Sequence, residues 1–565
     1  MNILGISCFD HSSAACLIQN GKIVAAVQEE RFNREKYSQK FPIESINYCL
    51  QEAQITVKDV DYIGFYERPF LKFSRVVINH VRAYPFSLPN FLYSMPQWLE
   101  NRLILPLSLE KDLGYTGKTL FIKHHLSHAA SAFLVSPFEE AAIITADGVG
   151  EQATLTVGQG CGTAIKINEE LCYPHSLGFL YAAITAYLGF RIFSGEGKVM
   201  ALAGYGKPVY ADAFRKMVKM HADGSFKINS RYLTLNRGKR MHSREMEKLL
   251  GPPRIYNSPL EQRHYDIAAS LQQCVEDILI RIARRAYEQT RFKNLCLAGG
   301  VFLNCVANHK ILEQTPFEHV FIQPAAGDSG GALGVALYID TAFCHNSRRQ
   351  VMSHAYYGPS FSEERIRRAV INKGLKYRQL PDDLLIPFIV EQLMRNKIVG
   401  IFRGRMEFGP RALGNRSILA NPACAEMKDI LNKNIKGREW FRPFAPVVLE
   451  ARKDEFFHLR DVSPFMLLAP RVREDKKECI PSAVHVDGTA RVQTIREETN
   501  PFLWELISAF DRLSGVPMLL NTSLNVRGEP IVNTPHEACA LFENTGIDFL
   551  VLENIVLSKE DAHYA

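Results

Sequence analysis

The chain has 565 residues, of which 47% are hydrophobic and 22% are charged. These values are typical of globular proteins and exclude an intrinsically disordered chain, and the length suffices for two or three domains of about 100–200 residues. The net charge of +7 is too small, over this length, to indicate nucleic-acid binding by itself.

Cysteine spacing and hydropathy predict the cellular compartment of the protein. No run of about 18 apolar residues occurs and no basic leader precedes the first strand, so we expect neither a membrane span nor a signal peptide. Twelve cysteines lie between Cys8 and Cys539 without a C-x-x-C pair. This pattern favours free thiols in a reducing cytoplasm over a zinc cluster or a disulfide scaffold.

An internal repeat marks the first half of the chain. Residues 2–30 follow the order strand, Asp10, small residues, strand, turn, strand. Residues 141–169 repeat this order, with Asp147 in the place of Asp10. A repeated unit of this size predicts two similar lobes in an α/β domain.

Two glycine-rich junctions between a strand and a helix follow, at Ala298-Gly299-Gly300 and at Gly327–Gly331. Glycines at the end of a strand let backbone N–H groups face an anion at the start of a helix. Together with the two aspartate hairpins, these junctions predict a nucleotide cleft between the two lobes.

Two further segments organise the chain. Phe70–Leu107 is the most apolar stretch, but prolines and arginines interrupt it, so we expect helices and loops that line a pocket or an interface. A polar stretch near 340–363 predicts a linker. The predicted domains are therefore 1–350 and 363–565, joined by a linker at 351–362.

A metal site is predicted from two histidines and two aspartates. His124 and His128 are four residues apart in a segment that favours a helix, so both imidazoles would face the same way and could ligate one ion. Asp147, which ends the repeated strand, and Asp328, in the second glycine-rich junction, could complete the shell. Two imidazoles and two carboxylates suit Fe(II), Mn(II) or Zn(II).

His11 follows Asp10 at the end of the first strand, where the cleft should open. A histidine is the natural base for a hydroxyl or amine nucleophile near neutral pH. From the residues alone, a loop histidine that bonds only backbone groups is an equally good interpretation.

The second domain carries the densest basic cluster. Between Arg403 and Arg442 there are nine cations and four acids, interleaved with glycines and prolines. Guanidinium groups next to open backbone suit phosphate or pyrophosphate. The polar run Asn521–Pro530, which follows an apolar strand, resembles a second part of this anion site. Nucleic-acid binding is the weaker interpretation, because aromatic residues are sparse in the cluster.

Seven blocks of sequence strongly resemble the O-carbamoyltransferases of antibiotic and nodulation-factor synthesis, in the family's order and over nearly the whole chain. They are Asp10–Ala14, His124–His128, Ser194–Met200, Ala298–Asn304, Gly327–Gly331, Glu407–Ser417 and Asn521–Ser523.

The resemblance implies a fold and a reaction. The N-terminal domain would be a duplicated actin-like domain (ribonuclease-H-like, of the ASKHA type), and the C-terminal domain a YrdC-like α/β domain. In that family the C-terminal domain makes carbamoyl adenylate from carbamoyl phosphate and ATP with Mg. The N-terminal domain, where a metal usually assigned as Fe(II) holds the intermediate, passes the carbamoyl group to an acceptor hydroxyl.

The resemblance also implies residue roles. His124, His128, Asp147 and Asp328 would hold the metal, His11 would be the base, and Asp10, Ser12 and Lys36 would lie near the acceptor or the intermediate. Gly148, Glu196, Lys198, Gly299, Gly300 and Asn304 would bind the nucleotide in the N-terminal domain. Arg411, Lys436, Arg442, Arg491, Asn521, Ser523 and Arg527 would bind carbamoyl phosphate and ATP in the C-terminal domain.

Two other functions stay open at this stage. A small-molecule kinase of the actin-like fold would explain the first domain but would give the basic cluster of the second domain no role. A tRNA-modification factor would need an extended basic face. The expected partners are carbamoyl phosphate, ATP and a small hydroxylated acceptor, without nucleic acid or membrane, and a homodimer is left open.

Overall fold

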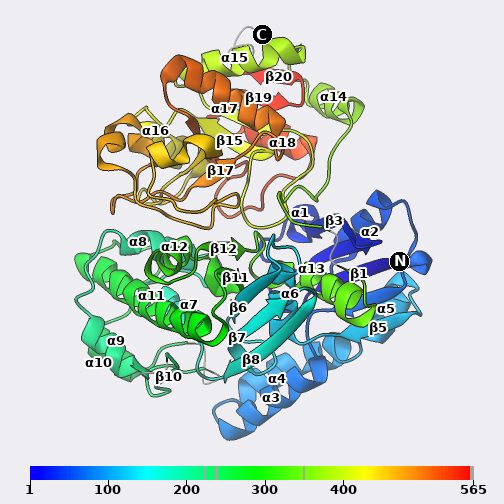
Figure 1. Cartoon of the computed structure of the whole chain (residues 1–565), viewed down its shortest axis with the longest axis vertical. Helices are drawn as coiled ribbons and strands as arrows, with labels where there is room; N and C mark the ends of the chain where they lie inside the picture. Colours follow the sequence, from blue (N-terminus) through cyan, green and yellow to red (C-terminus); the bar gives the residue numbers. More distant parts are fainter. Residues whose placement is uncertain (222–223, 236–239, 348–349, 560–565) are drawn as a thin grey trace. The chain divides into compact units, whose positions relative to one another are not determined.

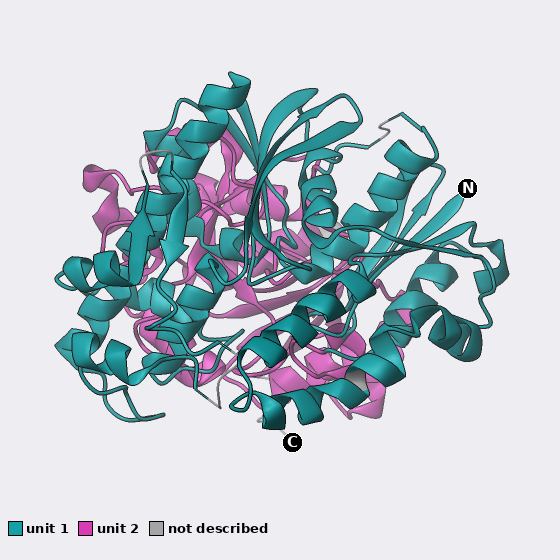
Figure 2. Cartoon of the chain, turned by 90° about the horizontal axis from the view of Figure 1, so that it is seen from below, with its two compact units in different colours: residues 1–29, 39–352 teal, residues 30–38, 353–565 magenta. Residues whose placement is uncertain are grey.

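The computed structural model describes residues 1–221, 224–235, 240–347 and 350–559 and divides the chain into two compact units (Figure 2). Unit 1 consists of Met1–Glu29 and Gln39–Met352, and unit 2 of Glu30–Ser38 and Ser353–Ala565. The division thus falls at Met352, where the sequence analysis placed a linker at 351–362. It differs from the predicted domains in one segment, because residues 30–38 belong to unit 2.

Within the described residues, unit 1 is built on two five-stranded sheets of the same design (Figure 1). The first has the order β3-β2-β1-β4-β5 and the second the order β8-β7-β6-β11-β12. The strands of the first sheet are β1 (Asn2–Ser7), β2 (Ala14–Gln19), β3 (Lys22–Gln28), β4 (Tyr62–Phe65) and β5 (Lys118–Phe121). Those of the second sheet are β6 (Glu140–Ala146), β7 (Ala153–Cys161), β8 (Ala164–Cys172), β11 (Asn294–Ala298) and β12 (His319–Ile322).

The pairing pattern confirms the predicted repeat. In each sheet three antiparallel strands are joined by hairpins, and the first of them also pairs in parallel with a later strand. Asp147 follows β6 directly, and two residues, Cys8 and Phe9, separate the end of β1 from Asp10. Because β1 and β6 hold the same position in their sheets, these two aspartates lie at equivalent strand ends.

Two equivalent helices pack against each other at the centre of unit 1. Helix α6 (His124–Phe133) follows β5, and helix α13 (Asp328–Tyr338) follows β12. A Cβ atom added to Gly334 of α13 would lie 1.8 Å from the carbonyl oxygen of Ser127 on α6, so the two backbones touch. His124 and Asp328 are the first residues of these two helices, and the contact therefore brings both toward one place.

The remaining helices of unit 1 cover the sheets. Helices α3, η2, α4 and α5 all lie between β4 and β5, which confirms that the apolar stretch Phe70–Leu107 is mainly helical. Their bounds and those of the other helices are α2 (Ile43–Glu52), α3 (Pro69–Arg82), α4 (Leu88–Gln97), η2 (Trp98–Arg102), α5 (Leu105–Leu113), α7 (Leu177–Tyr187), α8 (Glu196–Ala203), α9 (Ala211–Met217), α10 (Arg244–Leu250), α11 (Gln262–Thr290), η3 (Gly300–Leu303) and α12 (Cys305–Gln314). A small hairpin pairs β9 (Val218–Met220) with β10 (Phe226–Ile228).

Unit 2 is built on one mixed eight-stranded sheet, as far as it is described, in the order β13-β20-β19-β14-β15-β18-β16-β17. Its strands are β13 (Arg378–Gln379), β14 (Val399–Phe402), β15 (Arg416–Ala420), β16 (Ala445–Leu449), β17 (Gln493–Ile495), β18 (Met518–Ser523), β19 (Phe549–Leu552) and β20 (Ile555–Ser558). Its helices are α1 (Glu30–Asn33), α14 (Glu363–Asn372), α15 (Asp382–Met394), α16 (Met427–Ile430), α17 (Pro501–Ser514) and α18 (Pro535–Glu543). Both units are therefore α/β, as predicted.

The longest helix is α11, and its exposed face is charged. None of the helices in the described part of the chain combines the length and the apolar character needed to cross a bilayer.

The contact between α6 and α13 gives a prediction about stability. Gly334→Ala should lower the free energy of unfolding by about 1–3 kcal/mol, because the added methyl group overlaps the Ser127 carbonyl and must push the two helices apart. Thermal unfolding followed by circular dichroism measures the effect. Gly197→Ala in α8 is the matched control, since a Cβ there meets nothing within 4 Å. Equal melting temperatures for the two variants would contradict the close contact.

Candidate functional site

Four side chains of unit 1 converge at the starts of α6 and α13 and at the end of β6. One ligand atom each from His124, His128, Asp147 and Asp328 lies within 4.8 Å of all the others, and all four residues are buried. The two Nε2 atoms are 3.1 Å apart, and His128 Nε2 lies 3.0 Å from Asp147 Oδ2. The structure thus brings together the four residues predicted as ligands.

The spacing of these atoms fits a metal ion. A tetrahedral ion with bonds of about 2.0–2.1 Å holds its ligand atoms roughly 3.4 Å apart. The distances from His124 Nε2 to Asp147 and Asp328 are 3.7 and 3.8 Å, and His128 Nε2 lies 3.7 Å from Asp328. The donor set suits Fe(II), Mn(II) or Zn(II) equally.

Electrostatics in this cluster favour positive charge. Burial opposes a charge on His128, but hydrogen bonds to Asp147 and Asp328 outweigh it and raise the pKa of the imidazole to about 9. Burial likewise disfavours an ionised Asp147, yet bonds from His124 and His128 hold the pKa of its carboxyl well below the usual value. Two buried carboxylates therefore share a site that stabilises a cation.

Local backbone features set the histidines and Asp147 in place. The carboxylate of Glu151 accepts the backbone N–H of His124 at 3.0 Å and so caps the start of α6. A Cβ at Gly150 would lie 2.9 Å from the His124 side chain, and a Cβ at Gly300 would lie 3.2 Å from Asp147 Oδ1. Glycine is needed at both positions because the ligands approach the backbone closely.

Asp10 lies in a buried charged cluster beside Asp328. Its carboxylate pairs with Lys72 of α3 and, at 2.7 Å, with Arg102 of η2. The same two cations pair with Glu67, at 2.5 and 3.4 Å, and Glu67 is completely buried. We name Asp10, Glu67, Lys72 and Arg102 the Asp10 clamp; it contains two acids and two bases.

Tyr66 connects the Asp10 clamp to the metal ligands. Its hydroxyl lies 3.1 Å from Asp10 Oδ2 and 3.4 Å from Asp328 Oδ2, so it can donate to either carboxylate. Its ring also packs against His124, with centroids 5.3 Å apart. A single buried side chain therefore touches both groups.

His11 lies at the edge of the same site. Its Nε2 is 3.7 Å from Asp328 Oδ2, and its Nδ1 is 3.2 Å from the hydroxyl of Ser12. The side chain is 23% exposed, so a substrate can reach it. Burial raises the pKa of the Glu196 carboxyl on α8, and the charge of His11 reduces this rise. Glu196 therefore lies near His11.

The other residues predicted to bind a nucleotide in the first domain take different places. Gly148 donates its N–H to Asp147 Oδ1 at 2.6 Å, and Gly299 has a φ of +102° beside the Ala146 carbonyl, so both lie at the metal ligands. The Asn304 side chain caps α12 and pairs with Gln272. Lys198 lies over the ring of Phe190.

Unit 2 gathers a second group, which consists of cations. Burial lowers the pKa values of Arg438 and Arg442, and the surrounding guanidinium groups lower them further. Lys36 reaches this group although the residue is exposed. Partial loss of hydration and the charges of Arg442, Arg31 and Arg411 outweigh the opposing charge of Glu30 and lower its pKa to about 8. The cation cluster comprises Lys36, Arg411, Lys436, Arg438, Arg442, Arg491 and Arg527.

Mutual repulsion in the cation cluster favours a bound anion, because only an anion would offset so many positive charges. Glu439, which pairs with Arg527 at 3.1 Å, offsets part of this charge. Lys36, which is expected near the acceptor, belongs to unit 2 and lies close enough to Arg442 to feel its charge.

Three predicted residues shape the loop after β18. The ammonium of Lys436 is buried and donates to the Ser523 carbonyl and to both oxygens of Asn525, at 2.9 and 3.0 Å. The Ser523 hydroxyl also donates to Asn525, and Asn521 donates to Gln493. In this structure Lys436 therefore holds the loop that carries Arg527.

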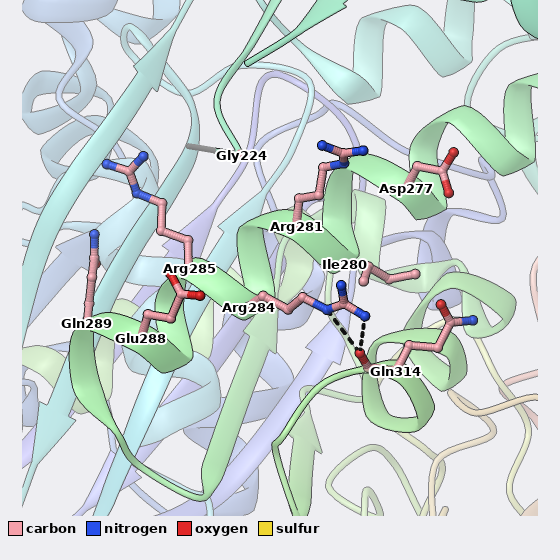
Figure 3. A pocket seen from close by; sticks show the side chains of 9 residues that line it. All are labelled: Gly224, Asp277, Ile280, Arg281, Arg284, Arg285, Glu288, Gln289 and Gln314. Carbon is pink, nitrogen blue, oxygen red and sulfur yellow. Dashed lines mark hydrogen bonds between the residues drawn. The ribbon is translucent and has the colours of Figure 1, made fainter. Parts of the chain in front are cut away.

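A separate pocket of about 720 Å³ lies along α11 (Figure 3). Two of its arginines are engaged by protein oxygens: Arg284 donates to the Gln314 carbonyl at 3.0 Å, and Arg285 to Glu169 at 2.7 Å. None of the residues selected from the sequence lines it, so we do not place the reaction there.

Comparison with known proteins shows the family to which this chain belongs. A family model described as the carbamoyltransferase N-terminus matches residues 2–337, and one described as the carbamoyltransferase C-terminus matches residues 390–559. The chain belongs to the carbamoyltransferase family. It is accordingly an enzyme that transfers carbamoyl groups.

Relatives match this carbamoyltransferase along almost all of its length. Protein sll1178 of Synechocystis is 44% identical, with 99% of this chain and 97% of that protein covered. Nodulation protein NolNO of Sinorhizobium fredii is 38% identical over 98% of this chain and 80% of its own. Nodulation protein U of Rhizobium tropici is 29% identical, with coverage of 99% and 96%.

Solved structures match the carbamoyltransferase more weakly. The crystal structure of HypF from T. kodakarensis is 15% identical, covers 61% of this chain and 48% of its own, and has a TM-score of 0.33. A ROK hexokinase from Thermus thermophilus is 14% identical, with 60% of this chain and all of that chain covered and a TM-score of 0.30. These scores are too low to assign a fold.

The N-terminal family region contains the metal ligands, and the C-terminal region contains most of the cation cluster. Four residues near the metal ligands were not selected from the sequence of the carbamoyltransferase: Tyr66, Glu67, Lys72 and Arg102. Charged residues inside an apolar segment were the available signal, since such residues are seldom buried unless they are paired.

The metal ligands give a prediction. His124→Ala and Asp328→Ala should each weaken binding of Fe(II), Mn(II) or Zn(II) by more than the roughly 10–100-fold that loss of an outer-shell partner costs. Metal analysis of folded protein after equilibrium dialysis measures this. His125→Gln is the matched control, because His125 is bonded to Thr145 and Ala153 and does not join the four ligands. Wild-type protein without bound metal would contradict the assignment.

The Asp10 clamp gives a second prediction. Lys72→Met should lower the free energy of unfolding by about 3–5 kcal/mol, because it leaves Glu67 buried with too little positive charge. Burial already raises the pKa of Glu67, and the substitution raises it further. The loss should therefore be smaller at pH 5 than at pH 8, since protonation of Glu67 relieves it.

Chemical unfolding at the two pH values measures this effect. The double variant Lys72→Met with Glu67→Gln should recover part of the lost stability at pH 8, and exposed Lys58→Met serves as the control. A double variant no more stable than Lys72→Met alone would show that the clamp charges are not coupled.

Proposed function

We propose that this carbamoyltransferase activates the carbamoyl group as carbamoyl adenylate in unit 2 and transfers it in unit 1 to a hydroxyl of a small natural product or sugar. The observation that carries the proposal is the presence of two chemically different groups in two separate units. A cation cluster suits phosphates, whereas two histidines and two carboxylates suit a metal ion.

The proposed reaction has three balanced steps. Water cleaves carbamoyl phosphate to carbamate and inorganic phosphate. Carbamate oxygen then attacks the α-phosphorus of ATP, bound with Mg, and pyrophosphate leaves as carbamoyl adenylate forms. Finally the acceptor hydroxyl attacks the carbamoyl carbon, its proton passes to a base, and AMP leaves. Because ATP and carbamoyl phosphate are metabolites of the cytoplasm, we propose that the reaction takes place there.

In unit 2 the cation cluster would bind the phosphates. Arg411 lies close enough to Arg438 and to Arg442 to add to the lowering of both pKa values by burial, so a polyphosphate there would be contacted from several sides. Lys36 would add a further charge from the segment 30–38, which is fixed to unit 2 by Arg34 bonding the carbonyls of Ile531 and Pro530 at 2.8 and 2.9 Å. We propose a YrdC-like fold for this unit.

In unit 1 His124, His128, Asp147 and Asp328 would hold a divalent ion, for which we propose Fe(II). Such an ion, when bound, supplies a Lewis acid that offsets negative charge on the adenylate phosphate. Gly148, Gly299 and Gly300 lie next to Ala146 and Asp147, so a nucleotide held by the ion would lie beside these glycines. The matching topology of the two sheets supports an actin-like fold for this unit.

His11 is the base in this proposal. A hydroxyl must lose its proton as the new C–O bond forms, and a positioned base accelerates this step by about 10²–10⁴-fold. The imidazole lies 3.7 Å from Asp328, at the border between the metal ligands and solvent. Asp10 is unsuited to that role because burial is outweighed by Arg102 and Lys72, which keep the pKa of its carboxyl well below the usual value.

Product analysis tests the proposed function. Purified protein incubated with carbamoyl phosphate, ATP and Mg should form AMP, pyrophosphate and inorganic phosphate, and should exchange labelled pyrophosphate into ATP. An acceptor screen by mass spectrometry should reveal a product heavier by one carbamoyl group. Formation of ADP and a phosphorylated product would contradict the proposal and indicate a kinase.

Two variants should separate the two steps. His11→Asn should lose about 10²–10⁴-fold in transfer but should retain pyrophosphate exchange, because Asn cannot accept the proton. Arg442→Ala should do the opposite: it should weaken the adenylation step about 10–100-fold by loss of a charged hydrogen bond, and pre-formed carbamoyl adenylate should restore transfer. Loss of both steps in either variant would contradict the division of labour.

A further inference from the structure

The surface of the helical insert, which comprises residues 69–113 between β4 and β5, is unusually apolar. Helices α3 and α4 lie side by side at one edge of unit 1 (Figure 1), and the ring of Phe73 packs on that of Trp98 with centroids 5.5 Å apart. Of the 25 exposed large hydrophobic side chains among the described residues, twelve belong to this insert. They are Phe70, Leu71, Ile78, Val81, Tyr84, Phe86, Leu88, Leu92, Tyr93, Leu99, Ile104 and Leu107.

The insert exposes apolar side chains on its outer side, although its inner side also buries Ala83, Trp98, Leu105 and Leu109. Its inner side buries the cations Lys72 and Arg102, which bind Asp10 and Glu67. Between Phe70 and Leu107, Arg82 and Glu100 are the exposed charged residues that the structure describes. Surface helices normally bury the apolar stripe and expose the charged one, so this outer face is built to be covered.

The size of this face suits a protein interface. Aromatic side chains each offer about 150–250 Å² of surface, so Phe70, Tyr84, Phe86 and Tyr93, which are 69–78% exposed, present on the order of 600 Å² by themselves. The eight exposed Leu, Ile and Val side chains add to this area. The largest apolar patch of an ordinary monomer measures about 300–600 Å², whereas a stable interface buries about 800 Å² per partner. Small molecules instead bind in concave pockets.

The charges indicate which kind of partner fits. Helices that lie on membranes carry an excess of Lys and Arg toward anionic headgroups. Here the exposed charges of the insert are mixed: Arg82 and Lys111 are positive, and Glu100, Glu110 and Asp112 are negative. A face that carries both signs complements itself under two-fold symmetry, in which residue i of one copy meets residue j of the other and j meets i.

We propose that the outer face of the helical insert binds a second copy of this chain and forms a two-fold symmetric homodimer. The same insert carries Lys72 and Arg102 of the Asp10 clamp on its inner side. Covering the outer face would therefore hold the helices that fix Asp10 next to Asp328. This inference does not depend on the proposed adenylate chemistry.

Oligomeric state tests the inference directly. Sedimentation velocity of the full chain at 1–50 µM should give twice the chain mass of 63.9 kDa. Val81→Lys with Leu92→Lys places like charges on the face at side chains that are 70% and 63% exposed, and it should raise the dimer dissociation constant at least about 100-fold. The matched control adds the same charge elsewhere, as Val486→Lys with Leu513→Lys, and should remain a dimer.

Two further measurements assign the face. Circular dichroism should show that both double variants are folded, and hydrogen exchange should show that residues 69–113 lose protection in the dissociated variant alone. A wild-type protein that is monomeric throughout this range, or a Val81→Lys, Leu92→Lys variant that remains a dimer, would overturn the proposal. Co-sedimentation of wild-type protein with phosphatidylcholine or phosphatidylglycerol vesicles, abolished by the same variant, would overturn it in favour of a lipid surface.

Discussion

The backbone contact between α6 and α13 is the constraint on which the site of unit 1 depends. Gly334 lies against the carbonyl of Ser127 with no room for a side chain. Each of the two helices follows the last strand of one sheet in the repeated unit, and each begins with a ligand residue. Close packing of equivalent helices therefore joins His124 to Asp328, which are distant in sequence, and places both next to Asp147 at the end of β6.

Charge is balanced differently in the two units. In unit 1 the buried charges of the Asp10 clamp are matched within the protein, two acids to two bases, so the clamp serves structure and positioning. The metal ligands beside it leave two carboxylates to be offset by a cation. In the cation cluster of unit 2, burial and then the neighbouring cations lower the pKa values of Lys436, Arg438 and Arg442. One unit is thus prepared for a positive ligand and the other for a negative one.

The helical insert links the site to the surface. Its inner side carries the paired cations Lys72 and Arg102, and its outer side exposes apolar side chains. A buried ion pair is destabilised when one partner moves away. A shift of the insert would separate Lys72 and Arg102 from Asp10, so the position of the insert and the environment of the Asp10 carboxylate are coupled. A second chain that covers the outer face of the insert would hold the insert more firmly in place, without adding any residue to the site.

The sequence by itself determined the repeat and the four candidate metal ligands. Both depend on local signals: the strand and hairpin pattern around Asp10 and Asp147, the spacing of four between His124 and His128, and the glycine-rich junction before Asp328. Such signals can be recognised in the sequence alone because the ends of strands and the starts of helices have characteristic residue preferences. The α/β character of both units and the helices of 70–107 could be predicted in the same way.

Only the tertiary structure decided the partners of Asp10 and the place of Lys36. Lys72 and Arg102 meet Asp10 across 62 and 92 residues, and no periodicity relates them. Lys36 lies close in sequence to the first sheet, yet Arg34 and its neighbours bond to unit 2 and take it there. Long-range ion pairs depend on how helices pack rather than on spacing along the chain, and packing is what a sequence pattern does not specify.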